Sequence, residues 1–259
     1  MYELAFPPAP PAPPKRRRIS PVFVAWLVVT LTGLGAVASS LGTAAHDYRS
    51  YRVPGAAMNP TIRPGESALV WVRHGEAVDR GDLVVFDRGA FAHPDSAGLA
   101  ALRVVAVGGD VVACCTGGQL SVDGKAISET YLSQDAYAHD PEATTPYLTR
   151  VHEGQVFVLG DERGRARDSR FLGVLPLSAV TGFVVGTGSV LHLTPLAPTT
   201  AFTDAGLPGA PYADGTVAGM RWWFLGGAAL VAAGLIGLVV TLVRIAGRRR
   251  RAAAGPPGR

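Results

Sequence analysis

The chain has 259 residues, of which 48% are hydrophobic and 17% charged, and its formal net charge is +4. A chain of this length and composition can bury one sizeable core and still supply membrane segments. Between two long apolar runs, 13 Lys and Arg residues stand against 19 Asp and Glu residues, a net charge of −6. The basic residues are therefore concentrated at the two ends, and the composition does not predict a nucleic-acid partner.

Residues 1–19 predict a disordered cytoplasmic tail. Prolines fill most of residues 7–14, which excludes regular helix or sheet there and favours polyproline II conformation. Four consecutive basic residues, Lys15 to Arg18, follow directly. A basic cluster beside an apolar run is typical of the cytoplasmic side of a membrane span.

A transmembrane helix is predicted over residues 20–44. The run from Pro21 to Gly42 contains no charged residue and is long enough to cross a bilayer. The basic residues before it and the small residues near its end also fit a cleavable signal peptide. The length of the run, without a clear short apolar centre, favours an uncleaved anchor.

Residues 45–194 predict a mostly β domain. Short segments rich in β-branched and aromatic residues are bounded there by Gly, Pro or Asp. The clearest of these segments are Ser67–Val72, Leu83–Phe86, Leu102–Val107 and Gln155–Leu159. The pair Asp123-Gly124 predicts a hairpin, because Asp-Gly readily adopts the turn that joins two antiparallel strands.

Cys114 and Cys115 are the only two cysteines, and they are adjacent. Neither this spacing nor that of the six histidines is typical of a metal site, so no metal or other cofactor is predicted. Three states of the pair stay open at this point: a disulfide between neighbours, two buried thiols, or a bridge between two molecules. A structural role is favoured over a redox function.

The region after the domain predicts a linker and a second span. Prolines and glycines favour a flexible linker over residues 195–220, and a second transmembrane helix is predicted over residues 221–244. The alternative for the second run, a buried core helix, needs a polar side that this run lacks. Basic residues in the predicted tail 245–259 place the C-terminus, like the N-terminus, in the cytoplasm. The sequence thus predicts a plasma-membrane protein with two spans and an extracytoplasmic β domain, whose partner is the lipid bilayer.

Four blocks of residues occur in an order that is typical of one enzyme family. They are Gly55–Ile62 with Met58, Pro60 and Thr61; Arg80–Phe86; Arg103-Val104 with Gly109-Asp110; and Gly160–Arg163 with Asp168–Arg170. The first resembles the Ser-x-Ser-Met-x-Pro-Thr-Leu box of type I signal peptidases of the serine-lysine class, and the others resemble the later boxes of that family. The form is that of high-GC Gram-positive bacteria, and the resemblance extends from the first span to about Val185.

The resemblance implies a reaction in which a serine hydroxyl attacks a signal-peptide carbonyl and a buried, neutral lysine takes its proton. A hydroxyl needs such a base, and a lysine serves only when desolvation lowers its pKa. Aligned on the blocks, the serine position is Ala57 and the lysine position is Leu102. Gly55 stands where the family has the serine that assists the oxyanion, and Ala166 where it has the serine that orients the lysine. None of the four positions carries the group that the reaction requires.

The resemblance also implies roles for other residues. These are peptide binding by Ala57, Met58 and Pro60, and structural roles for Arg103, Asp161, Asp168 and Arg170. The leading hypothesis is an inactive signal peptidase homologue that binds signal peptides or secreted-protein segments by strand addition, or that accompanies an active peptidase. Two alternatives are an active signal peptidase with a non-standard nucleophile and a structural membrane protein whose β domain mediates assembly.

Overall fold

The computed structural model describes residues 20–73, 77–115, 119–138, 140–189 and 192–253. The predicted N-terminal tail, residues 1–19, and the end of the predicted C-terminal tail, residues 254–259, lie outside this part. The chain divides into two compact units. One comprises residues 39–223 and holds the β domain; the other combines residues up to 38 with residues from 224 onward.

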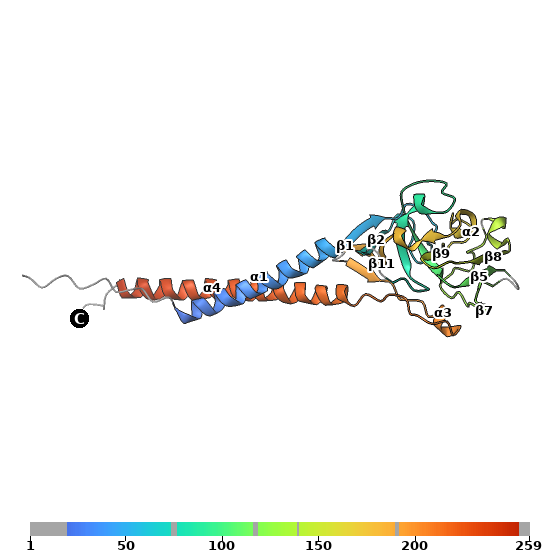
Figure 1. The fold of residues 1–259 in the computed structure, drawn as a ribbon. Coiled ribbons are helices and arrows are strands. Elements are labelled where there is room, and N and C mark those ends of the chain that lie inside the picture. Colours follow the sequence, from blue (N-terminus) through green and yellow to red (C-terminus); the bar gives the residue numbers. More distant parts are fainter. Residues whose placement is uncertain (1–19, 74–76, 116–118, 139, 190–191, 254–259) are drawn as a thin grey trace, which may run out of the picture. The chain divides into compact units, whose positions relative to one another are not determined.

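An antiparallel sheet of eight strands forms the frame of the β domain (Figure 1). Its strand order is β1-β2-β11-β3-β4-β9-β10, with β12 paired to β11. The strands are β1 (Tyr48–Arg52), β2 (Ser67–Val72), β3 (Leu83–Asp87), β4 (Leu99–Val107), β9 (Gln155–Leu159), β10 (Leu175–Pro176), β11 (Val180–Ser189) and β12 (His192–Pro195). All four segments predicted as strands lie in this sheet, so the mostly β fold is confirmed.

A smaller sheet, of order β7-β6-β5-β8, completes the domain. Its strands are β5 (Val111–Cys114), β6 (Ser121–Val122), β7 (Lys125–Ala126) and β8 (Tyr147–Arg150). The predicted hairpin joins β6 to β7, and its central residues Asp123 and Gly124 have φ angles of 51° and 75°. Both values are positive, as a tight two-residue hairpin turn requires.

Two hydrophobic cores cover opposite faces of the large sheet. Strand β9 shows this directly, because Val156 and Val158 belong to one core while Phe157 and Leu159 belong to the other. Successive residues of a strand point to opposite faces, so a strand buried on both sides reads as a continuous apolar run. At β4 and β9 the sheet is therefore buried on both faces. The short helices are η1 (Arg88–Ala90), η3 (Pro141–Thr144), α2 (Ser169–Leu172), η4 (Leu177–Ala179) and α3 (Ala201–Asp204).

The segment predicted as a flexible linker, residues 195–220, differs from that expectation in its first part. Helix α3 lies within it, and Phe202 is only 2% exposed in the second core. Further along, the Tyr212 amide donates to the Asp82 carboxylate at 2.6 Å. The buried Phe202 side chain and the Tyr212 hydrogen bond thus attach this segment to the domain.

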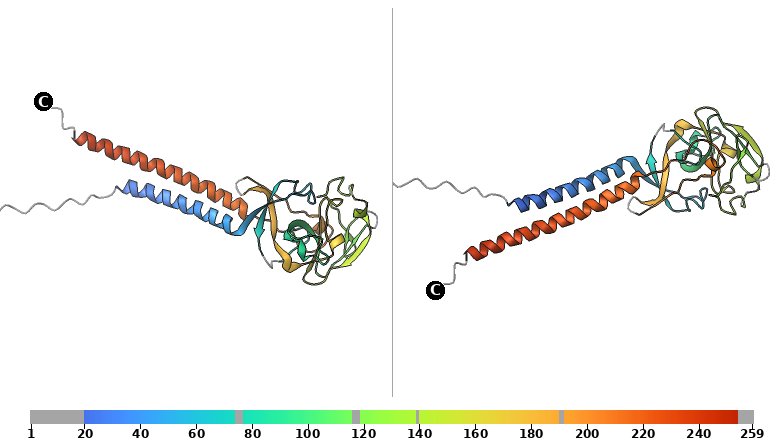
Figure 2. Two further views of the ribbon diagram at one scale, coloured as in Figure 1. Left: turned by 90° about the horizontal axis from the view of Figure 1, so that it is seen from above. Right: turned by 90° about the horizontal axis from the view of Figure 1, so that it is seen from below.

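Two long helices, α1 (Pro21–Asp47) and α4 (Thr216–Ala253), occupy the predicted spans. Both are long and apolar enough to cross a membrane. Within the unit that residues up to 38 and from 224 onward form, they run side by side in opposite directions (Figure 2). A Cβ on Gly33 would lie 2.7 Å from the Gly227 carbonyl oxygen, and one on Gly234 would lie 2.9 Å from the Thr30 backbone nitrogen. Small residues therefore allow close backbone contact, as is common between membrane helices.

Candidate functional site

An apolar pocket of about 280 Å³ lies in the β domain between the segment after β1 and strand β4. Most of its lining comes from residues 51–58 on one side and from Leu99–Leu102 on the other. Ala68 of β2 and Val85 of β3 complete the apolar surface. We call this cavity the apolar pocket. It is a concave, mostly hydrophobic site of the kind that binds ligands.

Three of the four positions that the resemblance assigns to the family's catalytic residues line the apolar pocket: Gly55, Ala57 and Leu102. Leu102 is 3% exposed and pairs with Val84 across the β3–β4 ladder. Ala57 is half-buried, and Gly55 is exposed. The fold thus brings together positions 45 residues apart in the chain, Ala57 and Leu102, and no polar side chain stands at any of the three.

The fourth position, Ala166, packs beside the Ala57 backbone through Gly160. A Cβ built on Gly160 would meet the Ala166 methyl group and lie 2.6 Å from the Ala57 carbonyl oxygen. The same carbonyl accepts a hydrogen bond of 3.0 Å from the Glu162 amide. All four positions therefore lie close together. Because Gly160 has no side chain, Ala166 and the Ala57 carbonyl can both pack against it.

Behind the apolar pocket, a buried ion pair joins Arg103 to Asp161. The Arg103 Nε and Nη2 atoms donate to the two Asp161 oxygens at 2.8 and 2.7 Å. The Thr61 hydroxyl donates to the same carboxylate and accepts from Arg103 Nη2 at 3.3 Å. Burial opposes the charge of Arg103, but the Asp161 carboxylate outweighs this effect and raises the arginine pKa. The cluster of Thr61, Arg103 and Asp161 thus links the first family box to strand β4. Arg103 is the residue that follows Leu102 in that strand.

A second buried pair joins Asp168 to Arg170. The Arg170 Nε and Nη2 atoms donate to the Asp168 carboxylate at 2.8 and 2.9 Å, and Asp168 also accepts from the Arg170 and Gly160 amides. Asp168 is thus the N-cap of α2 as well as an ion-pair partner. These contacts fix the start of α2 next to Gly160.

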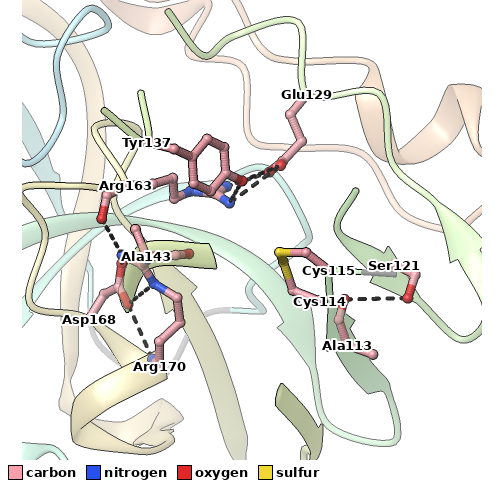
Figure 3. Close-up of a disulfide and its surroundings, with 10 residues drawn as sticks. All are labelled: Ala113, Cys114, Cys115, Ser121, Glu129, Tyr137, Ala143, Arg163, Asp168 and Arg170. Atoms are coloured by element: carbon pink, nitrogen blue, oxygen red, sulfur yellow. Dashed lines mark hydrogen bonds and ion pairs between the residues drawn. A yellow bond between two sulfur atoms is a disulfide. The ribbon is translucent and has the colours of Figure 1, made fainter. Parts of the chain in front are cut away.

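The sequence alone did not indicate a third buried cation, Arg163, whose guanidinium pairs with Glu129 (Figure 3). The Tyr137 hydroxyl accepts from Arg163 Nη1 at 2.9 Å. Burial alone would lower the pKa of Arg163, but the charge of Glu129 raises it instead. Arg163 stands in the last family box, yet nothing in the sequence near Glu129 marked it as the partner.

Of the residues predicted to bind peptide, Ala57 and Met58 line the apolar pocket, whereas Pro60 lines a different cavity. This second, more polar pocket has a volume of about 330 Å³ and lies between Pro60, Tyr131 and residues 197–200. Arg103 also reaches it, with its guanidinium carbon 4.2 Å from the centre of the Tyr131 ring. All polar groups of Arg103 are already engaged by protein atoms, so this cavity offers no obvious charged site.

Cys114 and Cys115 form a disulfide, which Figure 3 shows at the end of β5. Of the three states left open by the sequence, the structure contains the bridge between neighbours. Cys114 is 5% exposed in the second hydrophobic core. Among the residues that the structure describes, no group of three or more His, Cys, Asp or Glu side chains is placed to hold a metal ion.

Comparison with known proteins matches this chain to one family. A sequence model described as signal peptidase, peptidase S26, matches residues 23–187. Signal peptidase I of Bacillus licheniformis is 34% identical over 157 residues, which make up 57% of this chain and 80% of that protein. Signal peptidase I of Leptolyngbya laminosa is 27% identical over 185 residues, 69% of this chain and 85% of that protein. A crystal structure of a signal peptidase I from Enterococcus faecalis is 25% identical, with a TM-score of 0.35, and covers 42% of this chain and 97% of its own.

The chain belongs to the type I signal peptidase family, because the family match spans more than half of its 259 residues. The resemblance found in the sequence is thereby confirmed. Family membership, together with apolar helices near both termini, indicates a membrane-anchored protein.

Proposed function

We propose that this chain is a signal peptidase homologue that binds peptides without cleaving them. One observation carries the proposal: the positions equivalent to the family's reacting groups converge on the apolar pocket, and they are Gly55, Ala57, Leu102 and, behind Ala57, Ala166. A hydroxyl nucleophile and a base must lie within hydrogen-bond reach of each other. Here both positions are hydrocarbon.

The rest of the described pocket lining offers no replacement pair. It contains no Ser, Thr, Cys, His, Lys, Asp or Glu, and its one hydroxyl belongs to Tyr51. Its two arginines stay protonated in proteins and cannot serve as bases. The two lysines of the chain are Lys15 and Lys125, and the Lys125 amine instead donates to the Gly206 carbonyl at 2.6 Å.

The same pocket is suited to an extended peptide with small side chains. Its walls are a backbone segment, residues 53–58, and a strand, and both can offer main-chain hydrogen bonds to an added strand. Its volume is about 280 Å³, and Ala57 and Leu102 both line it, so a side chain seated between them contacts only apolar side chains. We infer that the ligands are signal peptides or segments of secreted proteins, and that an active signal peptidase is a further partner.

The proposed location follows from the charges beside the spans. Lys15–Arg18 precede α1, and Arg248–Arg251 lie in the last turns of α4. Because Lys and Arg are enriched on the cytoplasmic side of membrane proteins, both termini are placed in the cytoplasm and the β domain outside the plasma membrane. This orientation brings the apolar pocket to the compartment where exported chains emerge.

A binding and cleavage assay on the full-length protein in detergent tests the proposal. We expect a fluorescent signal peptide with a photoreactive residue to crosslink to residues 55–58, and a preprotein to stay intact. Gly55→Phe should block crosslinking, since a Cβ at Gly55 meets nothing within 4 Å and the ring can occupy the pocket. Gly215→Phe is the matched control, because its Cβ is equally unobstructed but lies outside the pocket.

Each other outcome favours one alternative. Cleavage of the preprotein at a normal rate by the unmodified chain would overturn the proposal in favour of an active peptidase with a non-standard nucleophile. Failure of every peptide to crosslink would favour a structural membrane protein.

The combined variant Gly55→Ser, Ala57→Ser, Leu102→Lys and Ala166→Ser should gain cleavage, because the frame places these four positions together.

A further inference from the structure

The lining of the apolar pocket carries positive charge, which the signal peptidase resemblance does not account for. Its lining contains two charged side chains, Arg52 at the end of β1 and Arg88 at the start of η1, and both are basic. No described residue of the lining is acidic. An otherwise hydrocarbon cavity enhances the effect of such charges, because its low polarity screens them poorly.

The charge of Arg88 is only partly compensated. Its Nη2 atom lies 2.8 Å from an Asp95 oxygen, while the other Asp95 oxygen lies 3.3 Å from Arg167 Nε. Two guanidinium groups thus share one carboxylate. The neighbouring Asp87 carboxylate is occupied by the backbone amides of Gly89 and Gly98.

Arg88 also has an unused donor. Its Nε atom is buried and has no hydrogen-bond acceptor among the described residues. The Arg88 side chain as a whole is 29% exposed, so a bound carboxylate can form a charge-assisted hydrogen bond with the accessible part of its guanidinium. Arg52 is exposed and forms no ion pair within the described part of the chain, so it is available to the same ligand.

The strand register sets the distance between this charge and the Ala57 end of the pocket. Leu99 pairs with Asp87, the residue before Arg88, whereas Leu102 lies three residues further along β4. Three residues of extended chain span about 10 Å. A peptide that lies along β4 therefore reaches Arg88 about three residues from the residue that contacts Ala57.

We propose that Arg52 and Arg88 select peptides that carry an acidic side chain, Asp or Glu, about three residues from the residue seated against Ala57. This inference rests on the proposed peptide-binding function and adds a specificity to it. A small residue lies against Ala57 and Leu102, and the carboxylate lies against the arginines. The occupant is thus an extended segment with one small and one acidic anchor.

Fluorescence anisotropy with the full-length protein in detergent tests this specificity. The probes are alanine-rich, C-terminally amidated peptides that are identical except for Glu, Gln or Lys three residues from a photoreactive position that crosslinks at residues 55–58. We expect the Glu peptide to bind about tenfold more tightly than the Gln peptide, a difference of about 1.4 kcal/mol, and the Lys peptide to bind more weakly still. The preference should decrease with added salt.

Variants separate recognition from folding. Arg88→Gln should abolish the preference for Glu, Arg88→Lys should keep part of it, and Arg52→Gln should weaken it. Arg63→Gln is the matched control, because Arg63 is an exposed arginine near the first family box but outside the pocket lining. Equal melting temperatures for Arg88→Gln and Arg88→Lys will show that a lost preference does not reflect a lost fold.

The two proposals fail in different ways. If no peptide of the series binds, the peptide-binding function itself is wrong. If the Glu and Gln peptides bind equally well, or if Arg88→Gln keeps the preference, peptides bind but the acidic selectivity is wrong. A preference that occurs only for a free C-terminal carboxylate, and not for an internal Glu, would also overturn the inference.

Discussion

The two sides of the first family box differ sharply in chemistry. On one side, Ala57 faces the apolar pocket opposite Leu102, where the family's reaction requires polar groups. On the other side, Thr61 joins the buried pair of Arg103 and Asp161. Only three residues of the chain therefore separate a hydrocarbon surface from a buried polar cluster.

This difference distinguishes residues that hold the frame from residues that would perform the reaction. A buried ion pair tolerates the loss of one partner poorly, because the remaining charge is left without compensation. An alanine or leucine at a cavity wall imposes no such penalty. The polar cluster can thus hold the frame without any polar group at positions 57 and 102.

The largest effect is expected from breaking the polar cluster. Arg103→Met should lower the free energy of unfolding by about 3–5 kcal/mol, because Asp161 would be left as an uncompensated buried charge. Denaturant unfolding of the full-length protein in detergent, followed by tryptophan fluorescence, measures this. The exposed Arg63→Gln should change stability by less than about 0.5 kcal/mol. A comparably small loss for Arg103→Met would mean that the cluster does not hold the frame.

A smaller loss is expected at the contact between Gly160 and Ala57. Gly160→Ala should cost about 1–3 kcal/mol, because the added methyl group would overlap the Ala166 methyl and the Ala57 carbonyl. It should also weaken peptide crosslinking by displacing Ala57. Gly55→Ala is the control, since its Cβ meets nothing within 4 Å. Equal stability of the two variants in the same unfolding assay would contradict the close packing described above.

Asp82, which binds the Tyr212 amide in the segment after β12, should make the stability of the domain depend on pH. Burial raises the pKa of Asp82 to about 6 in the folded domain, against a usual value of 3.8. The folded state then binds more protons than the unfolded state between these values, so the contribution of Asp82 to stability is present at low pH and is lost as the pH rises through 6. Between pH 5 and 7 the loss should be about 1 kcal/mol.

Asp82→Asn isolates this contribution. Unfolding curves of the parent protein and the variant are compared at pH 5, 6 and 7. The free energy of unfolding of the parent, relative to that of the variant, should decrease from pH 5 to pH 7. The asparagine keeps one acceptor for the Tyr212 amide but does not titrate. A difference that is independent of pH would show that Asp82 ionises normally in the fold.

The smallest effect is expected on the hydrocarbon side. Ala57→Ser alone should change stability by less than about 0.5 kcal/mol and should give no cleavage of a preprotein, because Leu102 cannot take the hydroxyl proton. Gel analysis of the preprotein after prolonged incubation measures the outcome. Measurable processing by this single variant would mean that another group in the pocket acts as a base.

The elements of the fold were predictable where local patterns and burial agree. Ser67–Val72 and Gln155–Leu159 coincide with β2 and β9, because both are mostly apolar runs with valine and an aromatic residue, and both contribute to more than one buried core. The Asp123-Gly124 turn was predictable from its requirement for positive φ angles. The packing of Phe202 was not, because a single aromatic residue among prolines and glycines carries no periodicity.

The site was predictable only in part. The family boxes located Ala57, Leu102 and Ala166, but their meeting depends on the register of β4 and on the approach through Gly160. Pro60 was expected beside Ala57 in the peptide site, yet the chain turns between them, and Pro60 lines the other cavity. Arg52 and Arg88 have no motif of their own, since strand ends commonly carry basic residues.

The disulfide between Cys114 and Cys115 closes a ring that contains only two residues. A crosslink contributes to stability mainly by restricting the unfolded chain, and this contribution grows with the length of chain enclosed. A bridge between neighbours encloses almost none, so it leaves the unfolded ensemble nearly as free as two thiols would. The disulfide therefore affects only the conformation at the end of β5. Its reduction should change the local backbone conformation there without unfolding the domain.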